Sequence, residues 1–242
     1  MTQNVYDNEE FFEGYSRLGR SIDGLDGAPE WPSLRALLPP LNGAGVVDLG
    51  CGFGWFCRFA RDAGAAHVTG YDVSEKMLAR ARETTRDEAV VYQRADLETL
   101  TLAPGSCDLV YSSLAFHYIE NLEALFGGVR RALRPGGRFV FSVEHPTFTA
   151  PSAPGWVVDA SGRKTWPLDD YLVEGPRVTD WLAKGVVKQH RTIGTYINML
   201  IARDFAVSHV EEWGPSDAQI DAWPALAEER QRPTFLLVAA RV

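Results

Sequence analysis

The chain has 242 residues, of which 45% are hydrophobic and 23% are charged, and its formal net charge is −8 at pH 7. This composition is typical of a globular protein with one full core, and the acidic balance argues against a nucleic-acid surface, which would show a basic stripe. The sequence shows neither a secretory signal nor an apolar run near the ~20 residues that span a bilayer, so we expect a cytoplasmic protein with no membrane partner.

The first 42 residues are rich in aromatic and turn-forming residues and precede the first predicted strand. Residues 43–145 then alternate short apolar runs, at 45–49, 67–73, 90–96, 107–113 and 138–145, with helical patterns. Ser74 and Asn121 stand where two of these helices should begin. Strands that alternate with helices in this way predict βαβ units and a mostly parallel sheet covered on both faces.

Residues 146–190, which we call the lid, hold five prolines and three tryptophans but little periodicity. We expect an inserted lid without regular structure, because long irregular stretches in compact domains usually cover a binding site. Residues 191–242 predict a helix with an apolar stripe from Ile193 to Ile201 and two strands, at 205–213 and 234–242. The sequence therefore predicts a single domain with four parts: residues 1–42, residues 43–145, the lid, and residues 191–242.

Three glycines lie within five residues of the stretch VVDLGCGFGWF, which follows the first predicted strand and opens a helix. The dinucleotide fingerprint G-x-G-x-x-G fails here, because Trp55 or Cys57 occupies the position of its third glycine. Asp48 instead precedes Gly50 by two residues, which suits a ligand that carries a cationic amine. The three cysteines are too few and too unevenly spaced for a disulfide framework or a metal site, so we expect small core residues and no metal.

Two further acids follow predicted strands. Asp72 ends the second strand and could accept hydrogen bonds from a ribose, and Asp96 ends the third and could bind an adenine amino group. Each acid alone also fits a structural role at a helix start or a turn. Together with Asp48 they mark the edge of the sheet at which open α/β proteins bind ligands.

The stretches VVDLGCGFG, VTGYDVSEKML, RADLETL, CDLVYSSLAFHYI and LRPGGRFVFSVEHP resemble the class I S-adenosylmethionine-dependent methyltransferases, and most closely the type-11 and ubiquinone-biosynthesis group. The resemblance implies a doubly wound, Rossmann-like sheet of seven mostly parallel strands with an antiparallel last strand and helices on both faces. It implies S-adenosylmethionine as cofactor, S-adenosylhomocysteine as product, and an N-terminal cover over the site, residues 1–42. The cofactor contacts that it implies, with the acid of the glycine loop, are Asp48, Gly50, Cys51, Gly52, Asp72, Val73, Met77, Asp96, Leu97, Ser112 and Leu114.

The methyl acceptor should bind at the open mouth of this site. His145, at the end of the fifth strand, is our first candidate for a general base, and Glu144 is the second. Candidates for substrate binding are Tyr15, Arg20, His117, His190 and Arg191. The aromatic lid and the missing basic channel favour a small-molecule acceptor, whose methylated atom the sequence leaves open among oxygen, nitrogen, sulfur and carbon.

Two rival hypotheses use the same loop. A non-catalytic module could bind S-adenosylmethionine as a sensor, but it would not need the polar groups expected on the acceptor side. An NAD-dependent oxidoreductase would keep Asp72 but would not account for Trp55, Asp96 or the strands after the lid. The sequence shows no coiled-coil seam and predicts no oligomeric state.

Overall fold

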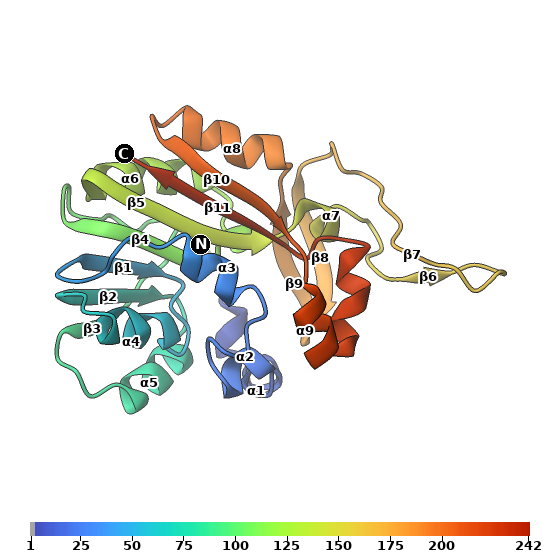
Figure 1. Ribbon diagram of the computed structural model, residues 1–242, viewed down its shortest axis with the longest axis horizontal. Helices are drawn as coiled ribbons and strands as arrows, with labels where there is room; N and C mark the ends of the chain where they lie inside the picture. Colours follow the sequence, from blue (N-terminus) through green and yellow to red (C-terminus); the bar gives the residue numbers. More distant parts are fainter. Residues whose placement is uncertain (1–2) are drawn as a thin grey trace.

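The computed structural model describes residues 3–242 and is built around a seven-stranded sheet in the order β10-β11-β5-β4-β1-β2-β3 (Figure 1). Strands β1 to β5 run parallel, and β11 is antiparallel to both β5 and β10. The predicted fold class, including the antiparallel last strand, is thereby confirmed. The strands are β1 (Gly45–Leu49), β2 (His67–Asp72), β3 (Val90–Arg94), β4 (Cys107–Ser113), β5 (Leu133–Glu144), β10 (Ala206–Trp213) and β11 (Phe235–Arg241).

Helices cover both faces of the sheet (Figure 1). One face carries α3 (Trp31–Ala36), α4 (Trp55–Asp62) and α5 (Glu75–Thr84), and the other carries α6 (Leu122–Ala132) and α8 (Ile193–Ile201). The expected caps are present, because Ser74 accepts a hydrogen bond from the Met77 amide and Asn121 accepts one from the Ala124 amide. All three cysteines are buried and free.

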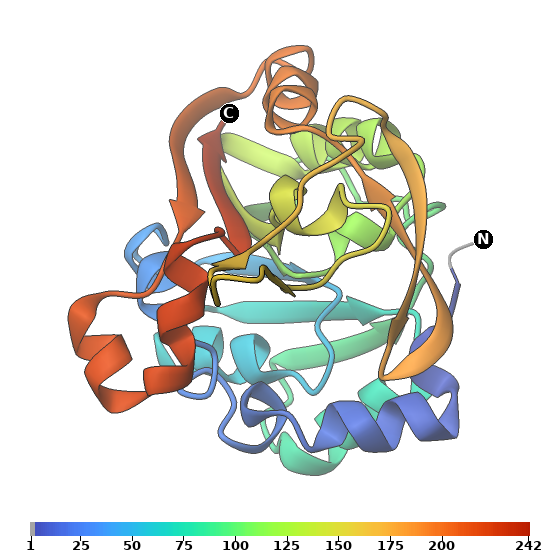
Figure 2. The same ribbon diagram turned by 90° about the vertical axis from the view of Figure 1, so that its right-hand side faces the viewer.

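The N-terminal segment forms η1 (Val5–Asp7), α1 (Glu9–Ser16) and α2 (Gly19–Ile22), which lie at the carboxyl-end side of the parallel strands (Figure 2). Asp7 fixes it to the start of α5, since its carboxylate accepts hydrogen bonds from the Ser74 hydroxyl at 2.6 Å and the Lys76 amide at 3.1 Å. The segment is thus held against the edge of the sheet where the ligand was expected.

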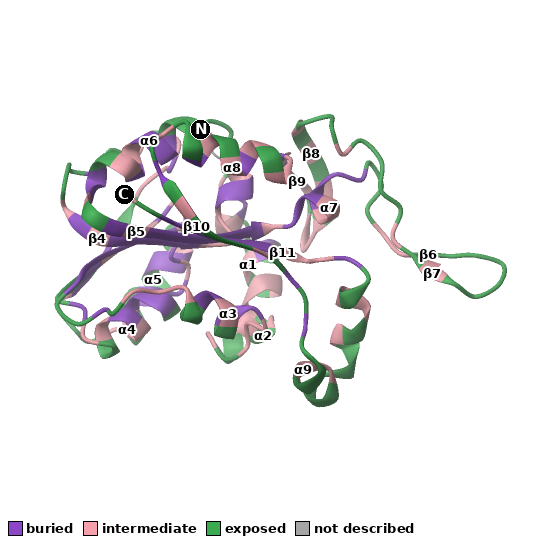
Figure 3. Cartoon of the chain, turned by 45° about the horizontal axis from the view of Figure 1, so that its top comes forward, coloured by how far each residue is buried: buried purple, intermediate pink, exposed green. Residues whose placement is uncertain are grey.

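The lid contains more regular structure than we expected. It forms α7 (Pro146–Thr149), a small pair of strands β6 (Val157–Val158) and β7 (Lys164–Thr165), and a hairpin of β8 (Gly175–Trp181) and β9 (Ala183–His190). The expectation of an irregular lid was wrong for the hairpin because β8 is half-exposed along its whole length and carries no apolar alternation. Figure 3 shows the β6–β7 segment as an exposed projection beside the buried sheet.

The tip of the hairpin packs against α1 in a small third core. The Trp181 and Phe11 rings lie 5.4 Å apart at nearly right angles, and Val186 is fully buried beside them.

Between β10 and β11 the chain forms two further helices, α9 (Asp217–Ala222) and η3 (Pro224–Arg230). None of the helices within residues 3–242 has the length and apolar character needed to cross a membrane.

Candidate active site

A cavity of about 340 Å³ lies at the carboxyl ends of the parallel strands, between the sheet, the N-terminal segment and the lid. Figure 2 shows α1 and the hairpin converging on this side of the molecule. Of the residues predicted from the sequence, thirteen line it: Tyr15, Arg20, Asp48, Gly50, Cys51, Gly52, Asp72, Val73, Met77, Leu97, Leu114, His117 and Glu144. Five do not: Asp96, Ser112, His145, His190 and Arg191.

The glycine loop is held in shape by its own backbone. Gly50, Gly52 and Gly54 all have positive φ angles, of 79°, 51° and 73°, which only glycine adopts at little cost. The amides of Gly50 and Cys51 both donate to the Tyr71 carbonyl, at 2.8 and 2.9 Å. A side chain on Gly50 would also collide with Ala115, whose Cβ would lie 2.4 Å from the added carbon. The loop therefore needs glycine at Gly50 for both conformation and space.

Two buried carboxyl groups, Asp48 and Asp72, face the cavity without a basic partner among the described residues. Burial raises the pKa of Asp48 to about 7, opposed by a hydrogen bond from the Cys57 thiol, and the charge of Asp72 raises it further. Burial likewise raises the pKa of Asp72 to about 6, although the amides of Ser74 and Gly52 each donate to it at 2.9 Å. Two uncompensated acids at one end of a cavity fit a cationic ligand such as the amine expected there.

Val73, Met77 and Leu97 add apolar side chains to the lining of the cavity. Asp96 lies just outside the lining, and its carboxylate accepts a hydrogen bond from the Glu98 amide at 3.1 Å, as in a turn. Ser112 points into the sheet instead, where its hydroxyl donates to the Leu49 carbonyl at 2.7 Å and ties β4 to β1.

Glu144, the last residue of β5, and His117, in the short helix η2 (Phe116–Tyr118), both line the cavity. The Glu144 carboxylate pairs through Oε1 with Lys188 of the hairpin at 2.6 Å, and its Oε2 is buried with no hydrogen-bond partner among the described residues. The His117 Nδ1 accepts from the Glu144 amide at 3.4 Å, so its ring proton sits on Nε2. Burial lowers the pKa of His117 to about 4, so the ring is neutral at pH 7.

His145, our first candidate for the base, points away from the cavity. It is fully buried, its Nδ1 accepts from the Thr147 amide at 3.1 Å as the cap of α7, and its Nε2 lies 3.0 Å from a Glu212 oxygen. Because both ring nitrogens are engaged and the ring does not line the cavity, the geometry gives His145 a capping role. Burial lowers its pKa to about 4.

His190 and Arg191 also hold structure together outside the cavity. The His190 ring contacts the Thr149 hydroxyl and the Tyr171 carbonyl, each at 2.9 Å, which ties the hairpin to the rest of the lid. Arg191 donates to the carbonyls of Ile119 and Glu120 at 2.6 and 2.7 Å. The two residues thus join the end of β9 to the body of the domain.

Three residues at or beside the cavity were not predicted from the sequence, namely Glu30, Tyr111 and Lys188. Glu30 is fully buried and binds Arg20 through both carboxylate oxygens, at 3.0 and 3.2 Å, and both residues line the cavity. Tyr111 is buried in β4 and also lines the cavity. Lys188 is the third, and no local motif marks any of them.

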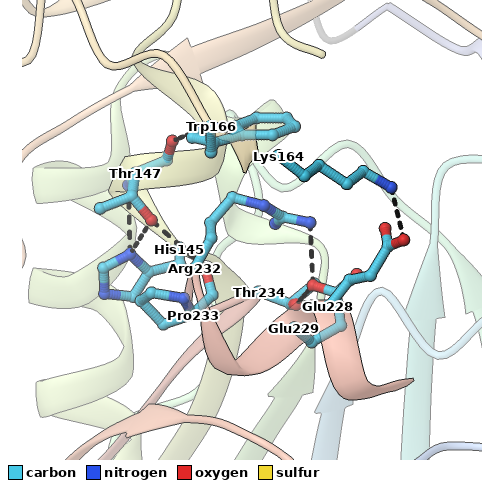
Figure 4. Close-up of polar contacts among 9 residues, drawn as sticks. All are labelled: His145, Thr147, Lys164, Trp166, Glu228, Glu229, Arg232, Pro233 and Thr234. Carbon is cyan, nitrogen blue, oxygen red and sulfur yellow. Dashed lines mark hydrogen bonds and ion pairs between the residues drawn. The ribbon is translucent and has the colours of Figure 1, made fainter. Parts of the chain in front are cut away.

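A second cluster joins the lid to the segment before β11 (Figure 4). We call it the latch, and it consists of Thr147, Phe148 and Trp166 of the lid with Glu229 and Arg232. Arg232 is 4% exposed, its guanidinium lies over the Trp166 and Phe148 rings at 4.3 and 4.6 Å, and it pairs with Glu229 at 2.8 Å. The Trp166 indole donates to the Thr147 carbonyl at 2.9 Å. Phe148 of this cluster lines the cavity, and so does Thr234, whose hydroxyl donates to Glu229, so the latch forms part of one cavity wall.

Comparison with known proteins agrees with this geometry. Residues 47–141 match a family model described as a methyltransferase domain. A crystal structure of an S-adenosylmethionine dependent methyltransferase from Mesorhizobium loti is 63% identical, covers 90% of this chain and all of its own, and superposes with a TM-score of 0.88. An uncharacterized protein of Haemophilus influenzae is 35% identical over 98% of this chain and 96% of its own length. A malonyl-[acyl-carrier protein] O-methyltransferase of Pectobacterium atrosepticum is 42% identical, over only 45% of this chain and 42% of its own length.

Proposed function

Because the chain belongs to the class I S-adenosylmethionine-dependent methyltransferases, in the type-11 group, we propose that it transfers the methyl group of this cofactor to a small-molecule acceptor. The observation that carries the acceptor class is the enclosure of the cavity by the chain's own N-terminal segment and lid hairpin. A cavity of about 340 Å³ that these two segments cover supports a small-molecule acceptor.

We assign the Asp48 end of the cavity to the amino-acid part of the cofactor. Asp48 would accept hydrogen bonds from its ammonium group, and the free N–H groups of Arg20 would bind its carboxylate. Asp72 would accept from the ribose hydroxyls, and Val73 and Met77 would pack on the adenine. S-adenosylmethionine supplies a methyl group on a sulfonium sulfur, which is already activated for displacement.

The remaining residues of the site would act on the acceptor. The acceptor would lie between Leu114, His117 and Glu144, with Tyr15 of the N-terminal segment covering it. Since the leaving group is good, alignment of the acceptor atom with the methyl group supplies much of the acceleration. The N-terminal segment and the lid hairpin would keep water away from the methyl group and so prevent its loss to hydrolysis.

Two alternative functions differ from this proposal in the acceptor that would be methylated or in whether any methyl group is transferred. A carrier-protein substrate, as in the malonyl-[acyl-carrier protein] O-methyltransferase of Pectobacterium atrosepticum, would have to thread its acyl group under the hairpin. A non-catalytic module would bind the cofactor but transfer no methyl group to any acceptor.

The first test is calorimetric titration with S-adenosylmethionine, S-adenosylhomocysteine and NAD in parallel. We expect micromolar binding of the first two and none of NAD. The second test incubates the protein with methyl-labelled S-adenosylmethionine and either a small-molecule extract or malonyl-acyl carrier protein. Label in small molecules supports the proposal, label only on the carrier protein favours the first alternative, and binding without any transfer favours the module.

A further inference from the structure

The acceptor end of the cavity offers no unpaired positive charge. Arg20 is the only Lys or Arg that lines the cavity in the described part of the chain; it pairs with Glu30 at 3.0 Å, and the proposed function assigns its remaining N–H groups to the cofactor. Lys188 does not line the cavity and is 3% exposed. Its ammonium group lies 2.6 Å from the Glu144 carboxylate and 4.9 Å from the centre of the Trp181 ring. An acceptor that carries a carboxylate or a phosphate would be buried here without a cation to pair with, which is costly.

The same end also lacks a strong general base. An alcohol requires one to remove its proton as it attacks. The His117 ring has its Nδ1 occupied by the Glu144 amide, and burial lowers its pKa to about 4, so it takes up a proton poorly near pH 7. The ammonium group of Lys188 occupies one oxygen of the Glu144 carboxylate, at 2.6 Å. A neutral amine needs no base in this step because its nitrogen carries a lone pair.

What this end does offer is hydrogen-bond acceptance and aromatic surface. Glu144 lines the cavity, and its Oε2 is buried without a partner among the described residues. An acceptor N–H that donates to this carboxylate would complete its hydrogen bonds. Tyr118, Phe148 and Trp181 line the cavity nearby and can pack on a carbon skeleton or lie against a cationic nitrogen.

We propose that the methyl acceptor is a small amine and that Glu144 binds its nitrogen, which makes the enzyme an N-methyltransferase. This inference rests on the proposed function. An ammonium group first gives one proton to solvent, and its lone pair then forms the C–N bond as the C–S bond breaks. The electron pair of that bond stays on sulfur, which leaves S-adenosylhomocysteine and a methylated ammonium ion. Glu144 stabilises the positive charge that moves onto nitrogen, so it contributes to transition-state binding.

The test follows methyl label from S-adenosylmethionine into a small-molecule extract and sorts the products by chemistry. A methylated amine is retained on a cation exchanger and survives mild base, a methyl ester releases methanol in base, and an ether is neutral and stable. We expect the label in the first class. Label in the ester or ether class would overturn the amine assignment, whereas binding of the cofactor with no labelled product would refute the proposed function and the amine assignment with it.

Variants then test the role of Glu144. Glu144→Gln should lower methylation of the labelled amine about tenfold or more, because one hydrogen bond to a charged group is lost. The affinity for S-adenosylhomocysteine, measured by calorimetry, should stay unchanged. Glu144→Asp should retain part of the rate because it keeps the charge. Glu123→Gln, the same change on the exposed face of α6, is the matched control. Equal amine methylation in Glu144→Gln and the control would exclude Glu144 from the acceptor site.

Discussion

Replacing Asp48 by asparagine should make the cofactor-free protein more stable while it removes most of the cofactor affinity. Asp48 is 2% exposed, and among the described residues only the Cys57 thiol donates a hydrogen bond to its carboxyl group, at 3.4 Å. Asparagine has nearly the same shape and keeps an oxygen that this thiol can donate to. The substitution therefore removes the cost of a buried charge with little change in packing.

The magnitude follows from the pKa of Asp48, which burial raises from 3.8 to about 7. The folded state therefore holds this proton more tightly than the unfolded state, and the stability contributed by the group falls as pH rises from about 4 to 7. Above pH 7 the buried charge costs up to about 4 kcal/mol, and near pH 5 about 2 kcal/mol. The advantage of Asp48→Asn should therefore be larger at pH 8 than at pH 5.

Urea denaturation of the cofactor-free protein at the two pH values measures this advantage, and calorimetry at pH 8 measures cofactor binding. We expect S-adenosylmethionine to bind about 10- to 100-fold more weakly to the variant, because a hydrogen bond to a charged group is lost. Asp26→Asn, the same change at an exposed position, should alter neither quantity. A variant that is destabilised equally at both pH values would refute the buried-charge reasoning, and unchanged affinity would remove Asp48 from the cofactor site.

Three further predictions concern the loop, the cap and the latch. Gly50→Ala should abolish cofactor binding in calorimetry, whereas Gly43→Ala, which has a similar φ of 76° but open space around it, should cost only about 1 kcal/mol in denaturation and bind normally. His145→Ala should keep its turnover but lose about 1 kcal/mol of stability with the cap of α7, and a large fall in kcat at full cofactor affinity would restore His145 as the base. Arg232→Met should lower the unfolding free energy by about 2 kcal/mol and speed proteolytic cleavage within 150–170, and an unchanged cleavage rate would show that the latch does not hold the lid.

The sequence predicted the sheet and the edge of the sheet at which the cavity lies, because both follow from local patterns. Apolar runs alternating with capped helices specify parallel strands, and parallel strands bring their carboxyl ends to one edge. That is why Asp48 and Asp72 could be placed together, although they are distant in the chain. A local pattern also argued against the NAD hypothesis, because Trp55 stands at a position where the dinucleotide fingerprint has its third glycine.

The acceptor side was less predictable because it is built from contacts between distant segments. Glu144 and His145 are neighbours at the end of β5, but only Glu144 lines the cavity, and the chain's turn into α7 decides this. Lys188 reaches Glu144 only because β8 and β9 pair, and the half-exposed β8 carries no apolar alternation that would predict the pair. Glu30 likewise gains its role only from the fold that brings Arg20 to it.

The position of β11 has a consequence for how the sheet is assembled during synthesis. This strand is synthesised after both β5 and β10, yet it lies between them in the sheet and pairs with each. Until it emerges, β5 is an open edge of a nascent sheet and β10 has no neighbour to pair with. Such an edge invites pairing with other chains. We therefore expect the growing polypeptide to depend on chaperone protection until β11 pairs with β5 and β10.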